Sequence, residues 1–251
     1  MDLGGRKVLF KALVGSHNYN LNTPDSDRDY KLFVCPTFDD LYFKKQFSDS
    51  YVGEVDYGAH DVRHVSHLWW KANVNFLEVL FSVDFLFNDE VSDKTKFLLL
   101  NVYDMKEELA RMNLPYLYDA CVGMHINKKR LVEKATSGTQ HLLDEFGFDT
   151  KQAMHSLRIL DFLERYAKRK FSNFKEAIWY EDGEKAKDFL LEVKHGKYSK
   201  EKYYEFAEKK LKVVEGLKPT YKSQTPDEKT KHKLVALTKE VVRLELFGKS
   251  S

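Results

Sequence analysis

The stretch VGSHNYNLNTPDSDRDYKLFV, residues 14–34, decides the fold expected for this chain. It begins with an apolar residue followed by Gly15 and Ser16, and in its second half Asp27 and Asp29 lead into an apolar segment. That second half alternates polar and apolar residues before it becomes continuously apolar and meets a proline, which is typical of a partly buried strand. We expect a turn at the Gly-Ser pair, a short helix or turn after it, and then a strand that starts at the two aspartates.

The two aspartates stand at positions i and i+2. On a strand such positions point to the same face, because side chains alternate across it. Carboxylates this close repel each other, and a divalent cation removes that cost. Asp27 and Asp29 therefore predict a Mg²⁺ site, with Mn²⁺ as the alternative ion, for phosphoryl chemistry. Two solvated turn carboxylates are the competing interpretation, and the Asp-x-Asp pattern alone does not decide between them.

The Gly-Ser pair predicts a contact with phosphate. A glycine before a helix start lets backbone N–H groups approach an anion, and the first turn of a helix adds partial positive charge. Ser16 adds a hydroxyl to the same contact. Ten residues separate Ser16 from Asp27, and the Gly-Ser pair and the Asp-x-Asp pair together are a more specific signal for this chemistry than either pair alone.

Composition narrows the class of protein. The chain has 251 residues, of which 43% are hydrophobic and 32% are charged, with a formal net charge of +2. This balance gives no indication of nucleic-acid binding through bulk charge. Cys35 and Cys121 are far apart, so neither a disulfide framework nor a structural zinc site is expected. The first residues do not follow a signal-peptide pattern, and no apolar run is long enough to cross a membrane. We expect a soluble cytoplasmic protein that does not bind membranes.

The expected secondary structure changes near residue 90. Before it, a strand is expected around VDYGAHDV, followed by two short helices; after it, the periodicity indicates helices only. The clearest helix is TKQAMHSLRILDFLERYAKRK, with Thr150 as its expected N-cap. The expected fold class is α+β: a mixed sheet with flanking helices in a domain over residues 1–92, and an all-α domain over residues 93–251.

The motif resembles the nucleotidyltransferase superfamily typified by DNA polymerase beta. Within it, GSHNYNLNTPDSDRDYKLFVCP is similar to a branch of predicted nucleotidyltransferases of bacteria and phages, some encoded beside RNA ligases. The resemblance extends through AHDVRHVSHLWWKANVNFLEVLFS, TKQAMHSLRIL and LLEVKHGKYSKE, and so over most of the chain. Asn20 stands where the branch usually has Gly, and we expect the turn to survive because Asn tolerates the left-handed conformation.

The resemblance implies a third carboxylate on a neighbouring strand. It places this carboxylate at Asp61, so that Asp27, Asp29 and Asp61 would be the catalytic and metal-binding residues. By spacing alone Asp56 is an equal candidate. The residues predicted to bind nucleotide are Gly15, Ser16, His17, Tyr19, Ser26, Lys151, His155 and Arg158.

Two groups of basic residues have competing interpretations. Lys151, His155 and Arg158 are spaced i, i+4, i+7 on one helical face, with Arg165 two turns further. A solvated basic face explains this spacing, while the resemblance implies contacts with a triphosphate or an RNA backbone. His60, His64 and His67 have a spacing that could serve a transition metal, and a polar helix face is the ordinary alternative.

The predicted function is Mg²⁺-dependent transfer of NMP from an NTP, with ATP among the candidates, to an acceptor hydroxyl, an activity of EC 2.7.7 type. The resemblance favours an RNA end, for example of tRNA, in RNA repair or modification. One alternative is an enzyme of toxin or antitoxin type that transfers NMP to protein. The other is a noncatalytic module that binds nucleotide or RNA. The base, the number of nucleotides added and the oligomeric state are left open.

Overall fold

The structure is a computed structural model that describes residues 2–24, 26–134 and 138–248. The chain divides into two compact units. Unit 1 comprises Met1–Asn113 and Pro226–Ser251, and unit 2 comprises Leu114–Thr225. Unit 1 contains the strands and unit 2 is helical. The expected fold class, a mixed sheet with helices in an α+β protein, is therefore confirmed.

A sheet of five strands forms the centre of unit 1. Its strands are β1 (Val8–Val14), β2 (Arg28–Val34), β3 (Ser48–Tyr51), β4 (Val55–Asp61) and β5 (Phe85–Phe87). Their order in the sheet is β3-β4-β2-β1-β5. The pair β2–β4 is parallel, and the other three pairs are antiparallel. β2 and β4 are the two strands expected from the sequence, while β3 and β5 are too short and exposed to give a clear signal.

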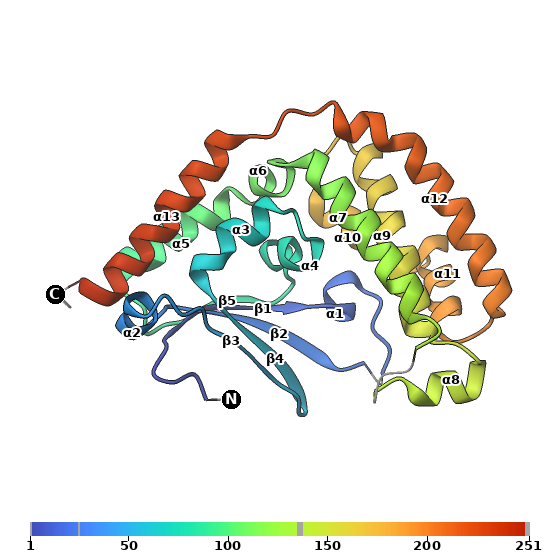
Figure 1. Cartoon of the computed structure of the whole chain (residues 1–251), viewed down its shortest axis with the longest axis horizontal. Helices are drawn as coiled ribbons and strands as arrows, with labels where there is room; N and C mark the ends of the chain where they lie inside the picture. The colour runs from blue at the N-terminus through green and yellow to red at the C-terminus, as the bar shows by residue number, and fades with distance from the viewer. Residues whose placement is uncertain (1, 25, 135–137, 249–251) are drawn as a thin grey trace. The chain divides into compact units, whose positions relative to one another are not determined.

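Aromatic side chains cover one face of this sheet. The Phe10 ring stacks on Phe33 and on Phe85, with ring centroids 4.6 and 5.3 Å apart. His60 lies on the same face and meets the edge of Phe76, whose helix covers this part of the sheet. Such aromatic pairs stabilise a fold by more than the burial of their surface alone would. This face carries the core of unit 1, and Figure 1 shows helices above it.

Helices from both ends of the chain complete unit 1. They are α1 (Ser16–Tyr19), α2 (Phe38–Tyr42), α3 (Val65–Trp70), α4 (Val74–Leu77), α5 (Asp93–Asp104), α6 (Lys106–Arg111) and α13 (Glu228–Phe247), with the 3₁₀ turns η1 (Val62–His64) and η2 (Glu78–Phe81). Glu245 of α13 accepts hydrogen bonds from Thr95 and Lys7 at 2.6 and 2.9 Å. The predicted boundary after residue 92 therefore lies inside unit 1, since α5, α6 and α13 pack there. Periodicity identifies a helix but does not say which surface it covers.

Unit 2 packs around one long helix. Its helices are α7 (Leu114–Leu131), α8 (Gln140–Phe146), α9 (Thr150–Lys168), α10 (Phe174–Ile178), α11 (Lys185–Lys194) and α12 (Lys200–Lys222). α9 contacts α7, α10, α11 and α12. Its N-cap is Asp149, one residue before the expected Thr150, and the Asp149 side chain accepts from the Gln152 backbone N–H. No helix in the described ranges has the length and apolar character needed to span a membrane.

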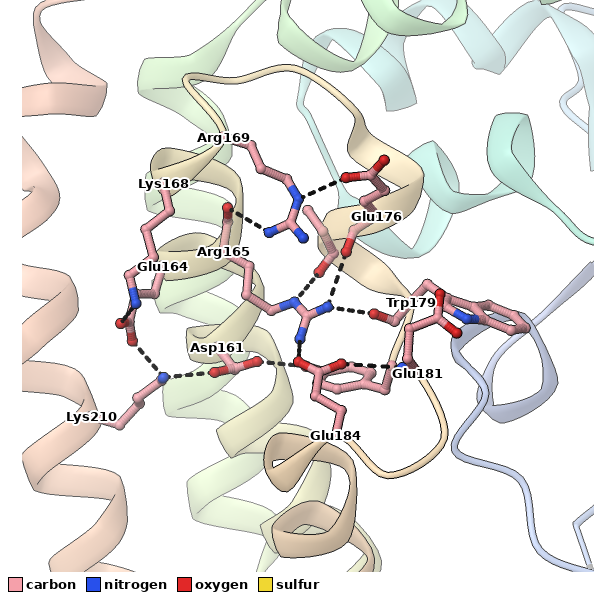
Figure 2. A network of polar contacts seen from close by, with 12 residues as sticks. Asp161, Glu164, Arg165, Lys168, Arg169, Glu176, Trp179, Glu181, Glu184 and Lys210 are labelled. Carbon is pink, nitrogen blue, oxygen red and sulfur yellow. Dashed lines mark hydrogen bonds and ion pairs between the residues drawn. The ribbon is translucent and has the colours of Figure 1, made fainter.

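Arg165 has a structural role in unit 2 (Figure 2). Its guanidinium donates to the carbonyl oxygens of Ala177 and Glu176 at 3.1 and 3.0 Å, and it also pairs with Glu184. These carbonyls lie at the end of α10, where helical C=O groups have no partner within their own helix. Arg165 thus holds α10 and the segment after it against α9. Its guanidinium donors are engaged within the protein, so it does not extend a free basic face.

Candidate active site

The Gly-Ser pair forms the sharp turn that the sequence predicts. β1 ends at Val14, α1 begins at Ser16, and Gly15 between them has φ 74° and ψ −147°. This region of backbone space is open essentially to glycine alone. A Cβ atom on Gly15 would also lie 3.0 Å from Oδ2 of Asp29. Glycine is thus required twice, by the backbone conformation and by the close approach of the Asp29 carboxylate.

α1 is a single turn held at both ends. Its last position, Asn20, adopts the left-handed conformation with φ 60° and ψ 36°, as expected for a turn in which Asn replaces Gly. His17 Nε2 lies 3.2 Å from the carbonyl oxygen of Ser26, which joins α1 to the segment leading into β2. His17 therefore helps to shape the turn, and its predicted contact with nucleotide stays a prediction.

Two residues predicted to bind nucleotide make contacts inside the protein. The Ser26 hydroxyl accepts from the backbone N–H of Thr23 at 2.8 Å and closes the turn before β2. The Tyr19 side chain is 2% exposed and belongs to the core. Its burial argues against direct contact with nucleotide in this conformation. Tyr19 is the last residue of α1 and is one of the two residues of this helix that are buried.

Strand register decides which acids lie near Asp29. In the parallel pair β2–β4, Asp29 is directly opposite Asp56. Paired residues of neighbouring strands point to the same face and lie roughly 5 Å apart across the ladder. Asp29 and Asp56 are both half-buried, and Asp27 is exposed just before β2. The structure therefore brings Asp56 together with Asp29 at the end of β2 beside Gly15.

Asp61 lies elsewhere. It pairs with Val34 at the other end of β2, five residues beyond Asp56 and roughly 16 Å along the strand. Five residues is an odd number, so the regular alternation of β4 also directs Asp61 to the opposite face. Its carboxylate is 1% exposed, accepts from the backbone N–H of Arg63 at 2.9 Å and forms an ion pair with the Arg63 guanidinium. The preference for Asp61 over Asp56 thus disagrees with this geometry, because spacing along the chain does not give the register between two strands.

A comparison with protein families finds one match for the chain. Residues 4–238 match the RlaP family, described as the RNA repair pathway DNA polymerase beta family. The chain belongs to this family. The match covers most of both units, so the resemblance inferred from the Gly-Ser turn and the Asp-x-Asp strand is confirmed. A search of curated proteins finds no match for the chain.

This RlaP-family chain carries a buried acid behind the Gly-Ser turn. Glu78 is 2% exposed, and its Oε2 accepts from the backbone N–H of Gly15 at 3.1 Å and from Nδ2 of Asn18 at 3.3 Å. The Glu78 carbonyl oxygen also accepts from Asn18 at 3.1 Å. The Gly15 N–H is thus engaged by Glu78 and is not open to a phosphate in this conformation. Sequence reasoning missed Glu78; the only signal is an acid inside the otherwise apolar segment FLEVLF.

Lys31 is a second residue near Asp29 and Glu78 that the sequence did not single out. It follows Asp29 by two residues and so shares its face of β2. Burial lowers the pKa of the Lys31 ammonium, while the charges of Glu78 and Asp29 act in the opposite direction. Its Nζ lies 5.1 Å from the centroid of the Phe76 ring. Lys31 places a positive charge among carboxylates that would otherwise repel one another.

The part of the chain that the structure describes holds no ready-made cage of protein ligands for a metal ion. Among the described residues, no three His, Cys, Asp or Glu side chains are arranged to hold a metal ion. This includes His60, His64 and His67, for which a metal role was left open. Burial, followed by the charges of Lys31 and His64, lowers the pKa of His60 to about 4. His60 packs between Phe33 and Phe76.

The other predicted nucleotide contacts belong to unit 2 of the RlaP-family chain. Lys151, His155 and Arg158 lie on α9, as expected from their spacing. The side chain of Lys151 is exposed, while Arg158 is only 3% exposed. Their contact with a nucleotide stays a prediction.

Removing the Glu78 carboxylate should destabilise the turn. We expect Glu78→Ala to lower the free energy of unfolding by about 2 kcal/mol, because the part-buried Gly15 N–H and the buried Nδ2 of Asn18 lose the carboxylate oxygen that they share. Glu78→Gln keeps an acceptor oxygen and should cost clearly less. Urea denaturation followed by circular dichroism measures both, with exposed Glu54→Ala as the control. Equal stability of Glu78→Ala and the unchanged protein would contradict this role.

Proposed function

We propose that unit 1 transfers a nucleoside monophosphate from an NTP to an acceptor hydroxyl and releases pyrophosphate. The observation that supports this most strongly is the approach of the Gly15 turn to the Asp29 carboxylate, with Asp56 opposite on β4. A turn that can admit phosphate and a strand pair that presents carboxylates lie side by side. Membership of the DNA polymerase beta-like RlaP family supports the same reaction class.

The carboxylates fit Mg²⁺ that is completed by its substrate. Mg²⁺ is commonly bound through one or two carboxylates together with substrate phosphates and water, rather than by a cage of protein ligands. Asp29 and Asp56 would supply the paired carboxylates, and Asp27 a third from the exposed start of the strand. Bound there, the ion would supply charge neutralisation at the reacting phosphate.

The remaining residues would position the nucleotide. Ser16 offers its hydroxyl at the turn, while Glu78 fixes the backbone of Gly15 from behind. Lys31, on the Asp29 face, reduces repulsion between the substrate's phosphates and the carboxylates. Catalysis would thus rest mainly on positioning and charge, as is usual for phosphoryl transfer.

The acceptor we propose is the hydroxyl at an RNA end. The support is the RNA repair pathway named in the family description. Transfer to a protein side chain, the toxin or antitoxin alternative, would use the same site. A noncatalytic role gains no support from a site where carboxylates remain paired across two strands.

Labelled nucleotides test the proposal. The full chain is incubated with Mg²⁺ and each α-³²P-labelled NTP, together with total RNA, purified tRNA or protein extract. We expect label in RNA, lost when EDTA replaces Mg²⁺. Label confined to protein would overturn the RNA acceptor and favour the alternative enzyme. No label with any acceptor would overturn the transferase proposal.

A further inference from the structure

A groove runs between two helices of unit 1, α5 and α13. These helices pack along each other, as Figure 1 shows. The groove has a volume of about 500 Å³, and its apolar lining consists of Phe97, Leu98 and Leu244. The hydroxyl of Thr95 in α5 donates to Glu245 of α13 at 2.6 Å, which holds the two walls together. We name this feature the α5–α13 groove.

Large apolar side chains stand exposed along the α5–α13 groove. Phe97 in its wall is 65% exposed, and Leu100, three residues further along α5, is also exposed. Phe247 is 59% exposed and follows Leu244 by three residues, so both lie on one face of α13. Exposed apolar surface that is rimmed by polar residues is typical of an interaction site. The face therefore carries a hollow and, beside it, aromatic side chains that could fill such a hollow.

The rim of the groove carries two acidic and two basic side chains. Each helix supplies one of each sign: Asp93 and Lys94 on α5, and Glu240 and Arg243 on α13. Arg243 Nε donates to Glu240 at 2.8 Å, an exposed pair that contributes little to stability and can exchange partners. In a two-fold contact the same surface lies on both copies, so acids of one rim can meet bases of the other. The charge pattern thus complements itself.

The two helices set the size of a contact on this face. α5 has 12 residues and α13 has 20. At about 1.5 Å per residue and a diameter of roughly 10 Å, they present on the order of 500 Å² together. Two copies in contact would bury on the order of 1,000 Å², which is near the lower limit for a specific interface. Association through this face should therefore be reversible and dependent on protein concentration.

We propose that the α5–α13 groove is the contact surface of a symmetric dimer of this chain. The exposed Phe247 of each copy enters the groove of the other, and the rim charges pair around the buried rings. An aromatic anchor inside a polar rim is the usual anatomy of such interfaces. The rim charges cancel, so the surface does not favour a polyanion such as RNA. This inference goes beyond the transfer reaction, because the surface includes none of the carboxylates assigned to it.

Phe247→Ser tests the aromatic anchor. Sedimentation equilibrium of the full chain over a range of concentrations should show a reversible dimer, and Phe247→Ser should weaken its association at least about tenfold. Phe38→Ser is the matched control, since Phe38 is 58% exposed on α2 and lies outside the groove. The control should dimerise like the unchanged protein. A chain that stays monomeric at every concentration, or equal association of the two variants, would overturn the proposal.

Two double variants test whether the occupant of the groove is a second copy. Lys94→Glu with Arg243→Glu makes all four rim charges negative, and Asp93→Lys with Glu240→Lys makes them all positive. Each double variant alone should be monomeric at low salt, because like charges then face each other. An equimolar mixture should form a dimer that contains one copy of each, which native mass spectrometry identifies by its mass.

The remaining outcomes of the charge test count against the proposal. If both double variants are folded by circular dichroism and their mixture stays monomeric, the rim charges do not meet across a dimer. If each double variant dimerises as strongly as the unchanged protein, the dimer uses another surface. Because no transfer is measured, these results are independent of the proposed enzymatic activity.

Discussion

Asp29→Asn is expected to reduce nucleotidyl transfer at least about 10³-fold, because the reacting phosphate loses the charge neutralisation that the paired carboxylates provide. The fold should persist. Asn has nearly the same shape, and the half-buried side chain can keep its place beside Gly15. Initial rates with labelled NTP and saturating Mg²⁺ measure the loss, and the melting temperature checks the fold.

Asp56→Asn is the companion variant, and it separates the two candidates for the third carboxylate. Because Asp56 is opposite Asp29 in the β2–β4 register, its loss should also abolish most of the transfer. Asp49→Asn is the matched control, since Asp49 is exposed on the neighbouring strand β3. An Asp56→Asn variant with full activity would exclude Asp56 from the reaction. Another acid would then have to supply the third carboxylate.

Asp61→Asn should lower the stability of the protein rather than its activity. The buried Asp61 carboxylate binds the Arg63 guanidinium and the Arg63 backbone, so its replacement leaves a partly buried cation unpaired. We expect a loss of about 3 kcal/mol in the free energy of unfolding. Urea denaturation measures this loss, again with Asp49→Asn as the control.

The activity of the Asp61→Asn variant, expressed per folded molecule, should stay close to that of the unchanged protein. The assay is made at low temperature, where the variant remains folded. A stable Asp61→Asn protein that no longer transfers nucleotide would reverse the assignment of Asp56 and Asp61.

The sequence predicted those parts of the site whose backbone conformation depends only on a residue and its neighbours along the chain. Gly15 and Ser16 form the expected turn, because no other residue tolerates the backbone conformation found at Gly15. Asn20 adopts the left-handed conformation that its side chain allows. β2 begins after Asp27, where the alternation of polar and apolar residues indicated a strand.

Long-range contacts were not predictable in the same way. Glu78 stands more than sixty residues from Gly15 along the chain, and only folding brings its carboxylate to the Gly15 N–H. The last helix, α13, looked like part of a helical C-terminal domain, yet its Glu245 bonds to residues near the start of the chain and on α5. Helical periodicity is a property of one segment, whereas the partner of each apolar face depends on the whole fold.

By itself, the sequence determined the α+β class, the family, the turn at Gly15 and the strand with Asp27 and Asp29, since each depends on neighbouring residues. Only the tertiary structure decided that Asp56, rather than Asp61, lies opposite Asp29. The physical reason is register. A strand can slide along its neighbour without changing its own sequence pattern, and a shift by an odd number of residues moves a side chain to the other face of the sheet.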